Sequence, residues 1–169
     1  TDWDDTGLYN RKIISVNSYG NKCITFVLGN NSSISHENRI KIENLFTNPF
    51  TYNAEVEEDF PEHIFPAEAE LLLKEGAQVM FLKNDVVTKR YFNGKIGVVK
   101  ILGKNKIIVD CDGVEIEVGK ETWENTRYTL NRNDGKLEQG TLGTFTQYPL
   151  RLAWAITIHK SQGLTFEKV

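Results

Sequence analysis

The strongest constraint on the fold is a short apolar run that leads directly into a polar cluster near the carboxyl end. The apolar run reaches Ile158, and His159 opens a polar cluster that ends at Gly163. A continuous apolar run of this length is typical of a strand that is buried on both faces of a sheet. Open α/β sheets bind their ligands at the carboxyl ends of such strands. We therefore predict a strand from Pro149 to Ile158, followed by a site suited to a polyphosphate or a nucleic-acid backbone.

The amino-terminal part of the chain is predicted to form a strand, a turn and a helix. Residues 22–28 have the alternation of a strand, and the turn Gly29-Asn30-Asn31 ends it. Ser33 or Ser35 can cap a helix that continues to Phe46. The apolar side chains of this helix that are available for burial are Ile40, Leu45 and Phe46.

Residues 76–146 contain strong turn signals that divide the sequence into short strands. Asn93-Gly94 and Asp112-Gly113 are dipeptides that adopt positive φ at low cost and close two-residue hairpins. Further turns are predicted at Gly103-Lys104-Asn105 and Asn133-Asp134-Gly135. Roughly five or six strands result, and this density of short strands indicates a closed or nearly closed small barrel, because closure removes exposed sheet edges.

Two strands in this region should supply a core. Between residues 114 and 118, valine and isoleucine alternate with glutamate, so that one face of the strand turns inward and the other meets water. The inward side chains predicted for this strand are Val114, Ile116 and Val118. The side chains predicted to oppose them are Ile107, Val109 and Cys111. Cys23 and Cys111 are isolated thiols, which we expect to be reduced core residues.

Charge is unevenly distributed along the chain. Residues 48–75 contain three of the four prolines, and residues 37–75 carry ten acids and three bases. This pattern indicates an irregular, acidic connector at 48–75 with at most short structure. Residues 78–130 carry nine bases and seven acids, an excess that is more typical of a solvated surface than of a DNA-binding stripe.

Composition sets broad limits on the kind of protein. With 169 residues, of which 40% are hydrophobic and 25% charged, the chain can bury one core or two small ones. No apolar run approaches the roughly twenty residues of a membrane span, and the amino end lacks the pattern of a signal peptide. We therefore expect a cytoplasmic protein without a membrane partner. The histidines are too dispersed to indicate a zinc site, so no metal ligand is predicted.

The segment from Leu150 to Thr165, LRLAWAITIHKSQGLT, resembles motif V of the superfamily 1B DNA helicases. These are the PIF-type and RecD-like enzymes, which move 5′ to 3′ on single strands. The strand, turn and helix predicted over residues 22–46 are similar to the motif IV region of the family's second motor domain. Residues 51–85 resemble the entrance to the family's inserted domain 2B, and YFNG at Tyr91 to Gly94 resembles a turn of that domain.

This resemblance implies an α+β protein in which a small SH3-like β-barrel is inserted into a partial RecA-like α/β domain. Residues 1–47 and 147–169 would form part of motor domain 2A. Residues 48–75 would be the connector, and residues 76–146 the barrel of domain 2B. The chain would be a C-terminal fragment of an ATP-dependent DNA helicase.

The first motor domain of such a helicase is not recognisable in the sequence. Its Walker A loop has a glycine, four further residues and then Gly-Lys-Ser or Gly-Lys-Thr, because the loop holds phosphates and magnesium. The nearest approach, Gly97 to Gly103-Lys104-Asn105, has five intervening residues and ends in asparagine. No apolar strand leads into an Asp-Glu pair. We therefore expect ATP and Mg²⁺ to be bound by the intact parent and not tightly by this chain, and we predict no catalytic residue.

The resemblance also implies roles for individual residues. His159, Lys160 and Ser161 would bind the backbone of single-stranded DNA. Gln162 and Gly163 would contact the nucleotide. The simpler alternative is a capped strand end with a solvated lysine, in which Ser161 caps the following helix. The basic residues that flank the Asn93-Gly94 turn are predicted to form a second DNA-facing edge: Lys89, Arg90 and Lys95.

Two functional hypotheses follow. In the first, the partners of the chain are single-stranded DNA and, in cis, the missing N-terminal motor domain. In the second, the chain is a stand-alone SH3-like module that binds nucleic acid or protein and has no enzymatic activity. A gene that continues on both sides, with a Walker A loop upstream, would favour the first hypothesis.

Overall fold

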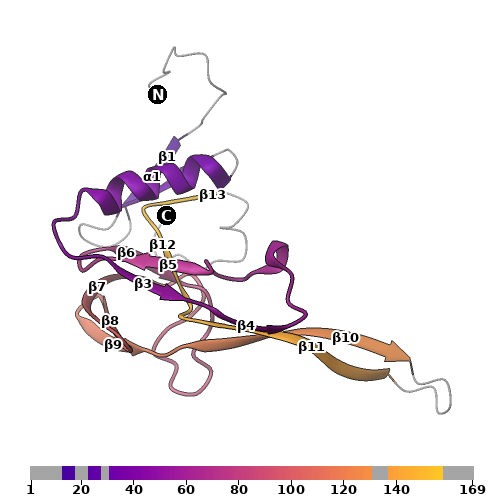
Figure 1. Cartoon of the computed structure of the whole chain (residues 1–169). Helices are drawn as coiled ribbons and strands as arrows, with labels where there is room; N and C mark the ends of the chain where they lie inside the picture. Colours follow the sequence, from indigo (N-terminus) through magenta and orange to yellow (C-terminus); the bar gives the residue numbers. More distant parts are fainter. Residues whose placement is uncertain (1–12, 18–22, 28–30, 131–136, 158–169) are drawn as a thin grey trace, which may run out of the picture.

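The computed structural model describes residues 13–17, 23–27, 31–130 and 137–157, and these residues are mostly β with one α-helix (Figure 1). The helix is α1 (Asn31–Glu43), and a short 3₁₀ helix, η1, spans Glu62–Ile64. The strands, in chain order, are β1 (Ile13–Asn17), β2 (Cys23–Val27), β3 (Phe50–Asn53), β4 (Glu55–Glu58), β5 (Glu70–Leu73), β6 (Gln78–Phe81), β7 (Ile96–Gly103), β8 (Lys106–Cys111), β9 (Val114–Val118), β10 (Glu121–Leu130), β11 (Leu137–Gln147), β12 (Leu150–Leu152) and β13 (Ala155–Thr157). Their sheets have the strand orders β1-β2-β13, β12-β6-β7-β8-β9, β10-β11-β4 and β3-β5.

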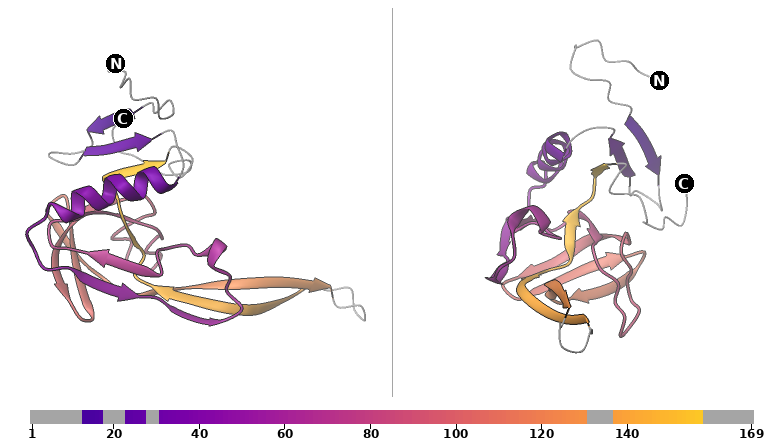
Figure 2. Two further views of the ribbon diagram at one scale, coloured as in Figure 1. Left: turned by 45° about the horizontal axis from the view of Figure 1, so that its top comes forward. Right: turned by 90° about the vertical axis from the view of Figure 1, so that its right-hand side faces the viewer.

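The sheet β1-β2-β13 joins segments that lie far apart in the sequence. β13 runs parallel to β2, with Ala155 opposite Thr25, and β1 runs antiparallel to β2. α1 packs against β13 (Figure 2). Leu28 lies outside the described residues, but the strand that precedes it and the strand that follows Trp154 are parallel neighbours. The two segments, which the resemblance assigns to one motor domain, therefore lie side by side in one sheet.

The prediction of a single strand from Pro149 to Ile158 is wrong, because the structure divides this segment into two strands. Leu150–Leu152 pairs antiparallel with β6, whereas Ala155–Thr157 pairs with β2. Leu150 and Ile156 are both buried, each in a different sheet. A continuous apolar run has no periodicity that could reveal a change of sheet. The sheet that contains β6, β7, β8 and β9 therefore also includes β12, which lies after residue 146, the predicted end of the barrel.

The buried face of α1 also differs from the prediction. Ile40 and Phe46 are exposed, and Leu45 is only partly buried against the main core. Ile42 is buried instead, and Asn38, one helical turn earlier, is buried with it. Residues four apart share one face of a helix. The prediction is wrong for Ile40 because the face that α1 buries is partly polar, and for Phe46 because α1 ends at Glu43.

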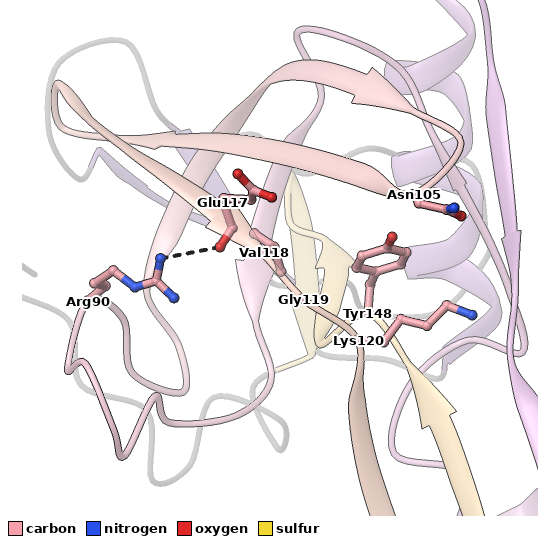
Figure 3. Close-up of a pocket in the computed structure, with 7 residues that line it drawn as sticks. All are labelled: Arg90, Asn105, Glu117, Val118, Gly119, Lys120 and Tyr148. Atoms are coloured by element: carbon pink, nitrogen blue, oxygen red, sulfur yellow. Dashed lines mark hydrogen bonds between the residues drawn. The ribbon is translucent and has the colours of Figure 1, made fainter.

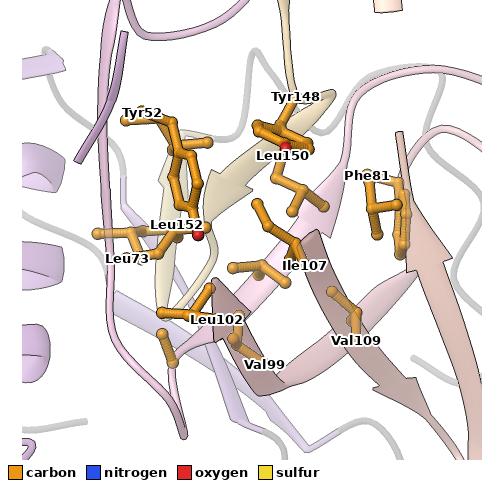
Figure 4. Packing of buried hydrophobic residues seen from close by; sticks show 14 of the residues in the cluster. Tyr52, Leu73, Phe81, Val99, Leu102, Ile107, Val109, Tyr148, Leu150 and Leu152 are labelled. Carbon is orange, nitrogen blue, oxygen red and sulfur yellow. The ribbon is translucent and has the colours of Figure 1, made fainter. Parts of the chain in front are cut away.

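Side chains from β6, β7 and β8 meet those of β3, β5 and β12 in the main core (Figure 4). Tyr52 on β3 and Leu73 on β5 belong to this core. The Tyr52 hydroxyl donates a hydrogen bond to the Gly103 carbonyl at 2.8 Å, and burial raises the pKa of Tyr52 to about 12. The connector thus has only short strands, as predicted, but its side chains complete the core.

The Asp112-Gly113 turn is confirmed as a two-residue hairpin. It joins β8 to β9, and the φ angles of its two residues are 58° and 88°, both positive as such a turn requires. On the strands that it connects, Ile116 and Val118 are buried, as are the predicted opposing side chains Ile107, Val109 and Cys111. Val114 is 59% exposed, contrary to the prediction, because it directly follows the turn.

The Asn93-Gly94 pair does not close a two-residue hairpin. β6 ends at Phe81 and β7 begins at Ile96, so the two strands are joined by the long loop 82–95. Gly94 has a φ angle of 100° and lies in a four-residue turn, in which the Lys95 amide donates to the Phe92 carbonyl at 3.0 Å. The dipeptide suits this turn as well, because the turn requires positive φ only at the glycine.

β10 and β11 form a long antiparallel ribbon that extends away from the remaining strands (Figure 1). The register shifts between Asn125 and Thr126, which marks a β-bulge. β4 pairs with β11 near the base of the ribbon, where Phe60 and Phe145 form a second, smaller core. The turn predicted at Asn133-Asp134-Gly135 lies outside the described residues.

Candidate nucleic-acid interface

The polar cluster predicted to bind DNA and nucleotide lies outside the described residues: His159, Lys160, Ser161, Gln162 and Gly163. The structure does describe β13, the strand that precedes this cluster in the sequence. Among the residues that the structure describes, β13 lies at an edge of its sheet, paired with β2, and α1 packs against it. For this part of the chain, the structure shows how β13 is held in place.

Asn38 on α1 holds the beginning of β13 with its side-chain amide. Its Nδ2 donates to the Ala155 carbonyl at 2.9 Å, and its Oδ1 accepts from the amides of Trp154 and Ala155 at 3.1 and 2.9 Å. Asn38 is only 6% exposed, so these bonds are shielded from water. A side-chain amide that binds both polar groups of one residue acts as a neighbouring strand would.

Gln78 on β6 holds the residue just before this point. The Ala153 amide donates to the Gln78 carbonyl at 2.9 Å, and Gln78 Nε2 donates to the Ala153 carbonyl at 2.8 Å. Gln78 is buried as well. The passage from β12 into β13 is therefore fixed on both sides of Trp154.

Neither Asn38 nor Gln78 was among the residues predicted to matter for the site. The available signal was weak. Asn38 lies four residues before Ile42 and hence on the same helical face, but Ile42 was not itself recognised as buried. Gln78 begins an apolar strand, a position at which polar residues are usually exposed.

The loop 82–95 is organised by the Asp85 carboxylate. Its oxygens accept from the Thr88 amide at 2.8 Å, from Arg90 Nε at 3.2 Å and from the Thr88 hydroxyl. These bonds, chiefly those from Thr88, hold the pKa of Asp85 well below its usual range. At the other end of the loop, Asn84 Oδ1 accepts from the Asn93 amide at 2.7 Å.

The predicted second DNA-facing edge lies entirely within this loop. Arg90 binds Asp85 and donates to the Glu117 carbonyl at 3.5 Å (Figure 3). Lys95 Nζ lies 3.5 Å from the Arg90 carbonyl and 6.0 Å from the centre of the Phe92 ring. Lys89 adopts a positive φ of 54° and is exposed. The three basic residues are thus brought together, but Arg90 is already engaged in holding the loop.

Asp85→Ala is expected to loosen this loop. The substitution removes the acceptors that tie Thr88 and Arg90 to the start of the loop. Trypsin should then cleave after Lys89 or Arg90 about tenfold faster, because local opening exposes the backbone to the protease. Glu70→Ala is the control, since Glu70 is exposed and lies outside the loop. Equal cleavage rates for both variants would contradict the role assigned to Asp85.

A shallow hollow of about 670 Å³ lies beside this loop (Figure 3). It is lined by Arg90, Asn105, Glu117, Val118, Gly119, Lys120 and Tyr148. Lys120 Nζ pairs with Glu55 at 2.5 Å, and Arg90 pairs with Asp85. Both cations of the hollow are thus neutralised by acids, which makes it a poor site for a phosphate.

Three further lysines within residues 76–146 are also paired with acids. Lys83 contacts Glu121 at 2.9 Å, Lys100 contacts Glu115 at 3.4 Å, and Lys106 contacts Glu117 at 3.7 Å. Such pairing agrees with the interpretation of the small basic excess as a solvated surface. In the part of the chain that the structure describes, no cluster of metal-binding side chains is present. No helix there is long and apolar enough to cross a membrane.

The chain resembles known helicases in sequence and in structure, although no family model matches it. The ATP-dependent DNA helicase Pif1 of Campylobacter jejuni is 29% identical over 161 residues, which cover 86% of this chain and 35% of that protein. The crystal structure of Bacteroides sp. Pif1 in complex with ADP-AlF4 matches with a TM-score of 0.73 at 41% identity, over 82% of this chain and 31% of that one. Bacteroides Pif1 bound to ssDNA matches at a TM-score of 0.69 with the same identity, over 82% of this chain and 32% of that one.

The parallel pairing of β2 with β13, the helix against it and these matches define the chain as part of a superfamily 1B DNA helicase. Within that superfamily, the chain belongs to the Pif1 family. It spans 21% and 35% of the length of two curated relatives that it matches.

Proposed function

We propose that this chain contributes part of motor domain 2A and the inserted domain 2B to an ATP-dependent 5′ to 3′ DNA helicase. Residues 1–47 and the chain from β13 onward belong to the motor domain, and residues 48–75 connect it to the insert. The sheet β12-β6-β7-β8-β9 is the SH3-like barrel. The observation that carries the proposal is the parallel pairing of β13 with β2, because the chain that leaves this edge continues in sequence to His159.

The known complexes of relatives indicate which ligands to expect. Crystal structures of Bacteroides Pif1 contain ssDNA in one case and ADP-AlF4 in another. By similarity, His159, Lys160 and Ser161 bind the phosphates of single-stranded DNA through charge-assisted hydrogen bonds, which position the strand without reading its sequence. Gln162 and Gly163 contribute to the far wall of the ATP cleft. Lys89 and Lys95 add a weaker DNA-facing edge, while Arg90 holds their loop.

ATP hydrolysis requires groups that this chain does not supply. A Walker A loop and a magnesium carboxylate belong to the N-terminal motor domain in cis. ATP and Mg²⁺ bind at the cleft between the two motor domains, and closure of that cleft alternates the strength of the DNA contacts. The chain by itself therefore binds single-stranded DNA weakly and does not hydrolyse ATP.

Lys160→Ala tests this function in the full-length protein. If Lys160 binds a phosphate, its loss should lower affinity for single-stranded DNA about tenfold, the value of one charge-assisted contact. The magnitude of the slope of log affinity against log salt concentration should decrease by about one, as expected when one fewer counterion is released. ATPase stimulated by DNA should decrease more than basal ATPase. Titration of a fluorescent oligo-dT at several salt concentrations, with parallel ATPase assays, measures these effects.

Lys41→Ala is the matched control, because Lys41 is an exposed lysine on α1. It should leave DNA affinity and both ATPase rates unchanged. Equal losses of basal and stimulated ATPase in Lys160→Ala would contradict DNA contact and indicate a nucleotide or folding role. ATP turnover by the 169-residue chain itself, if abolished by Lys160→Ala, would contradict the proposal that ATP hydrolysis requires the N-terminal motor domain.

A further inference from the structure

In the link between the inserted sheet and the motor-domain sheet, almost every residue is held by hydrogen bonds to a neighbouring element. β12 ends at Leu152 and β13 begins at Ala155. Ala153 is bonded through both its amide and its carbonyl to Gln78 of β6. Ala155 is bonded through both of the same groups to Asn38 of α1. Only Trp154 lies between the two anchors, and its amide is also held by Asn38.

We propose that Asn38 is a positioning residue, which sets the place of the DNA-contacting segment by fixing the start of β13. The inference rests on the function proposed above, because it assumes that His159 and Lys160 contact DNA. Asn38 itself touches no DNA in this proposal. It acts through β13, whose Ala155 to Thr157 are the last described residues before that segment.

The burial of Asn38 makes this anchor effective. Its side chain is 6% exposed, and Ala155 is 1% exposed, so water cannot easily replace the lost bonds when the amide is removed. On its other side, the described part of β13 pairs with β2 through Ala155, Ile156 and Thr157. The three hydrogen bonds from Asn38 add a second hold on the start of the same strand.

The two anchors also connect two parts of the fold. Gln78 belongs to the inserted sheet and Asn38 to the helix that covers β13. Because one residue separates the anchored positions, a shift of the inserted sheet relative to α1 must either strain these bonds or move the start of β13. The DNA-contacting segment is thereby linked mechanically to the insert.

The test compares Asn38→Ala with Lys160→Ala and with the double variant. Binding of the chain to a fluorescent oligo-dT at low salt should weaken about tenfold in Asn38→Ala, as expected for loss of buried hydrogen bonds that place a contact. If Asn38 acts through the same segment as Lys160, the double variant should bind at most about threefold more weakly than Lys160→Ala. Additive losses of affinity in the double variant would contradict the inference that Asn38 and Lys160 act through the same segment.

Hydrogen exchange provides a readout that does not depend on DNA. The amides of Trp154 and Ala155 should exchange at least about tenfold faster in Asn38→Ala, because their acceptor is gone, while those of β8 should keep the wild-type rate. Equal acceleration throughout the described strands would indicate general destabilisation and overturn the positioning role. Asn38→Asp is the second variant, in case the alanine variant does not fold. It keeps the oxygen that accepts from Trp154 and Ala155 but places a second oxygen, in place of the donor, against the Ala155 carbonyl, so its affinity should also lie below that of the wild type.

A destabilised control separates positioning from stability. Ile116→Ala removes a fully buried side chain of β9, away from the passage. It should lower the melting temperature at least as much as Asn38→Ala and leave affinity for oligo-dT unchanged in the folded protein. Loss of affinity in both variants would overturn the inference. If Lys160→Ala has no effect on binding, the proposed function fails; if Lys160→Ala weakens binding and Asn38→Ala does not, only the positioning role fails.

Discussion

Gly97→Ala is expected to destabilise the protein by about 3 kcal/mol, near the upper end for overpacking of a core. A Cβ at Gly97 would lie 2.3 Å from Val109 Cγ1, 2.8 Å from Cys111 Sγ and 2.9 Å from the Asp110 carbonyl oxygen. Val109 and Cys111 are buried, so their side chains have no free space to enter. The backbone oxygen of Asp110 can move only if β8 moves, and β8 is paired on both sides.

Gly119→Ala is the matched control for this prediction. Gly119 lies in the short link between β9 and β10, and no atom lies within 4 Å of a Cβ added there. Its substitution should change the free energy of unfolding by no more than about 0.5 kcal/mol, the usual range for surface sites. Urea denaturation of both variants with a common m-value measures the difference. A Gly97→Ala variant as stable as Gly119→Ala would show that β7 and β8 are not as closely packed as the structure has them.

The turns and the parallel pair were predictable because their signals are local or strongly patterned. Asp112-Gly113 forms a two-residue hairpin because both residues tolerate positive φ, a property of the dipeptide alone. The pairing of β2 with β13 followed from the resemblance of two segments to motifs of one domain. Sequence signals of this kind can be recognised without knowledge of the tertiary fold.

The course of the chain after Pro149 was not predictable for a physical reason. Leu152 and Ile156 are equally apolar, and each is buried, but they lie in different sheets. The break between them is stabilised by amides of Asn38 and Gln78, which are remote in sequence. Tertiary hydrogen bonds of this kind leave no periodic signal in the strand that they interrupt.

The candidate site was only partly accessible to sequence reasoning. His159 and Lys160 were recognised from their order after an apolar strand, and their role stays a prediction because they lie outside the described residues. Asn38 was not recognised, because an asparagine in a mostly polar helix resembles its solvated neighbours. Arg90 was assigned to DNA on charge alone, whereas its bonds to Asp85 depend on how the loop folds back.

Gln147 occupies a buried position where three segments meet. It is fully buried at the end of β11, and its Nε2 lies within hydrogen-bonding distance of the carbonyls of Tyr52, Glu68 and Ala69, at 2.9, 3.1 and 3.2 Å. Its Oε1 accepts from the Tyr148 amide at 3.0 Å. One side chain thus joins β3 and the segment before β5 to the strand that leads into β12.

Gln147→Leu is expected to lower the free energy of unfolding by about 3 kcal/mol, because each buried polar group that loses its partner costs about 1 to 3 kcal/mol and several lose one together. Leucine has a similar volume, so the loss reports hydrogen bonding rather than a cavity. Gln139→Leu, at an exposed position on the same strand, should change stability by less than about 0.5 kcal/mol. Urea denaturation compares the two. Equal stabilities would mean that the carbonyls of Tyr52, Glu68 and Ala69 find other donors, and that the amide does not hold the connector to the end of β11.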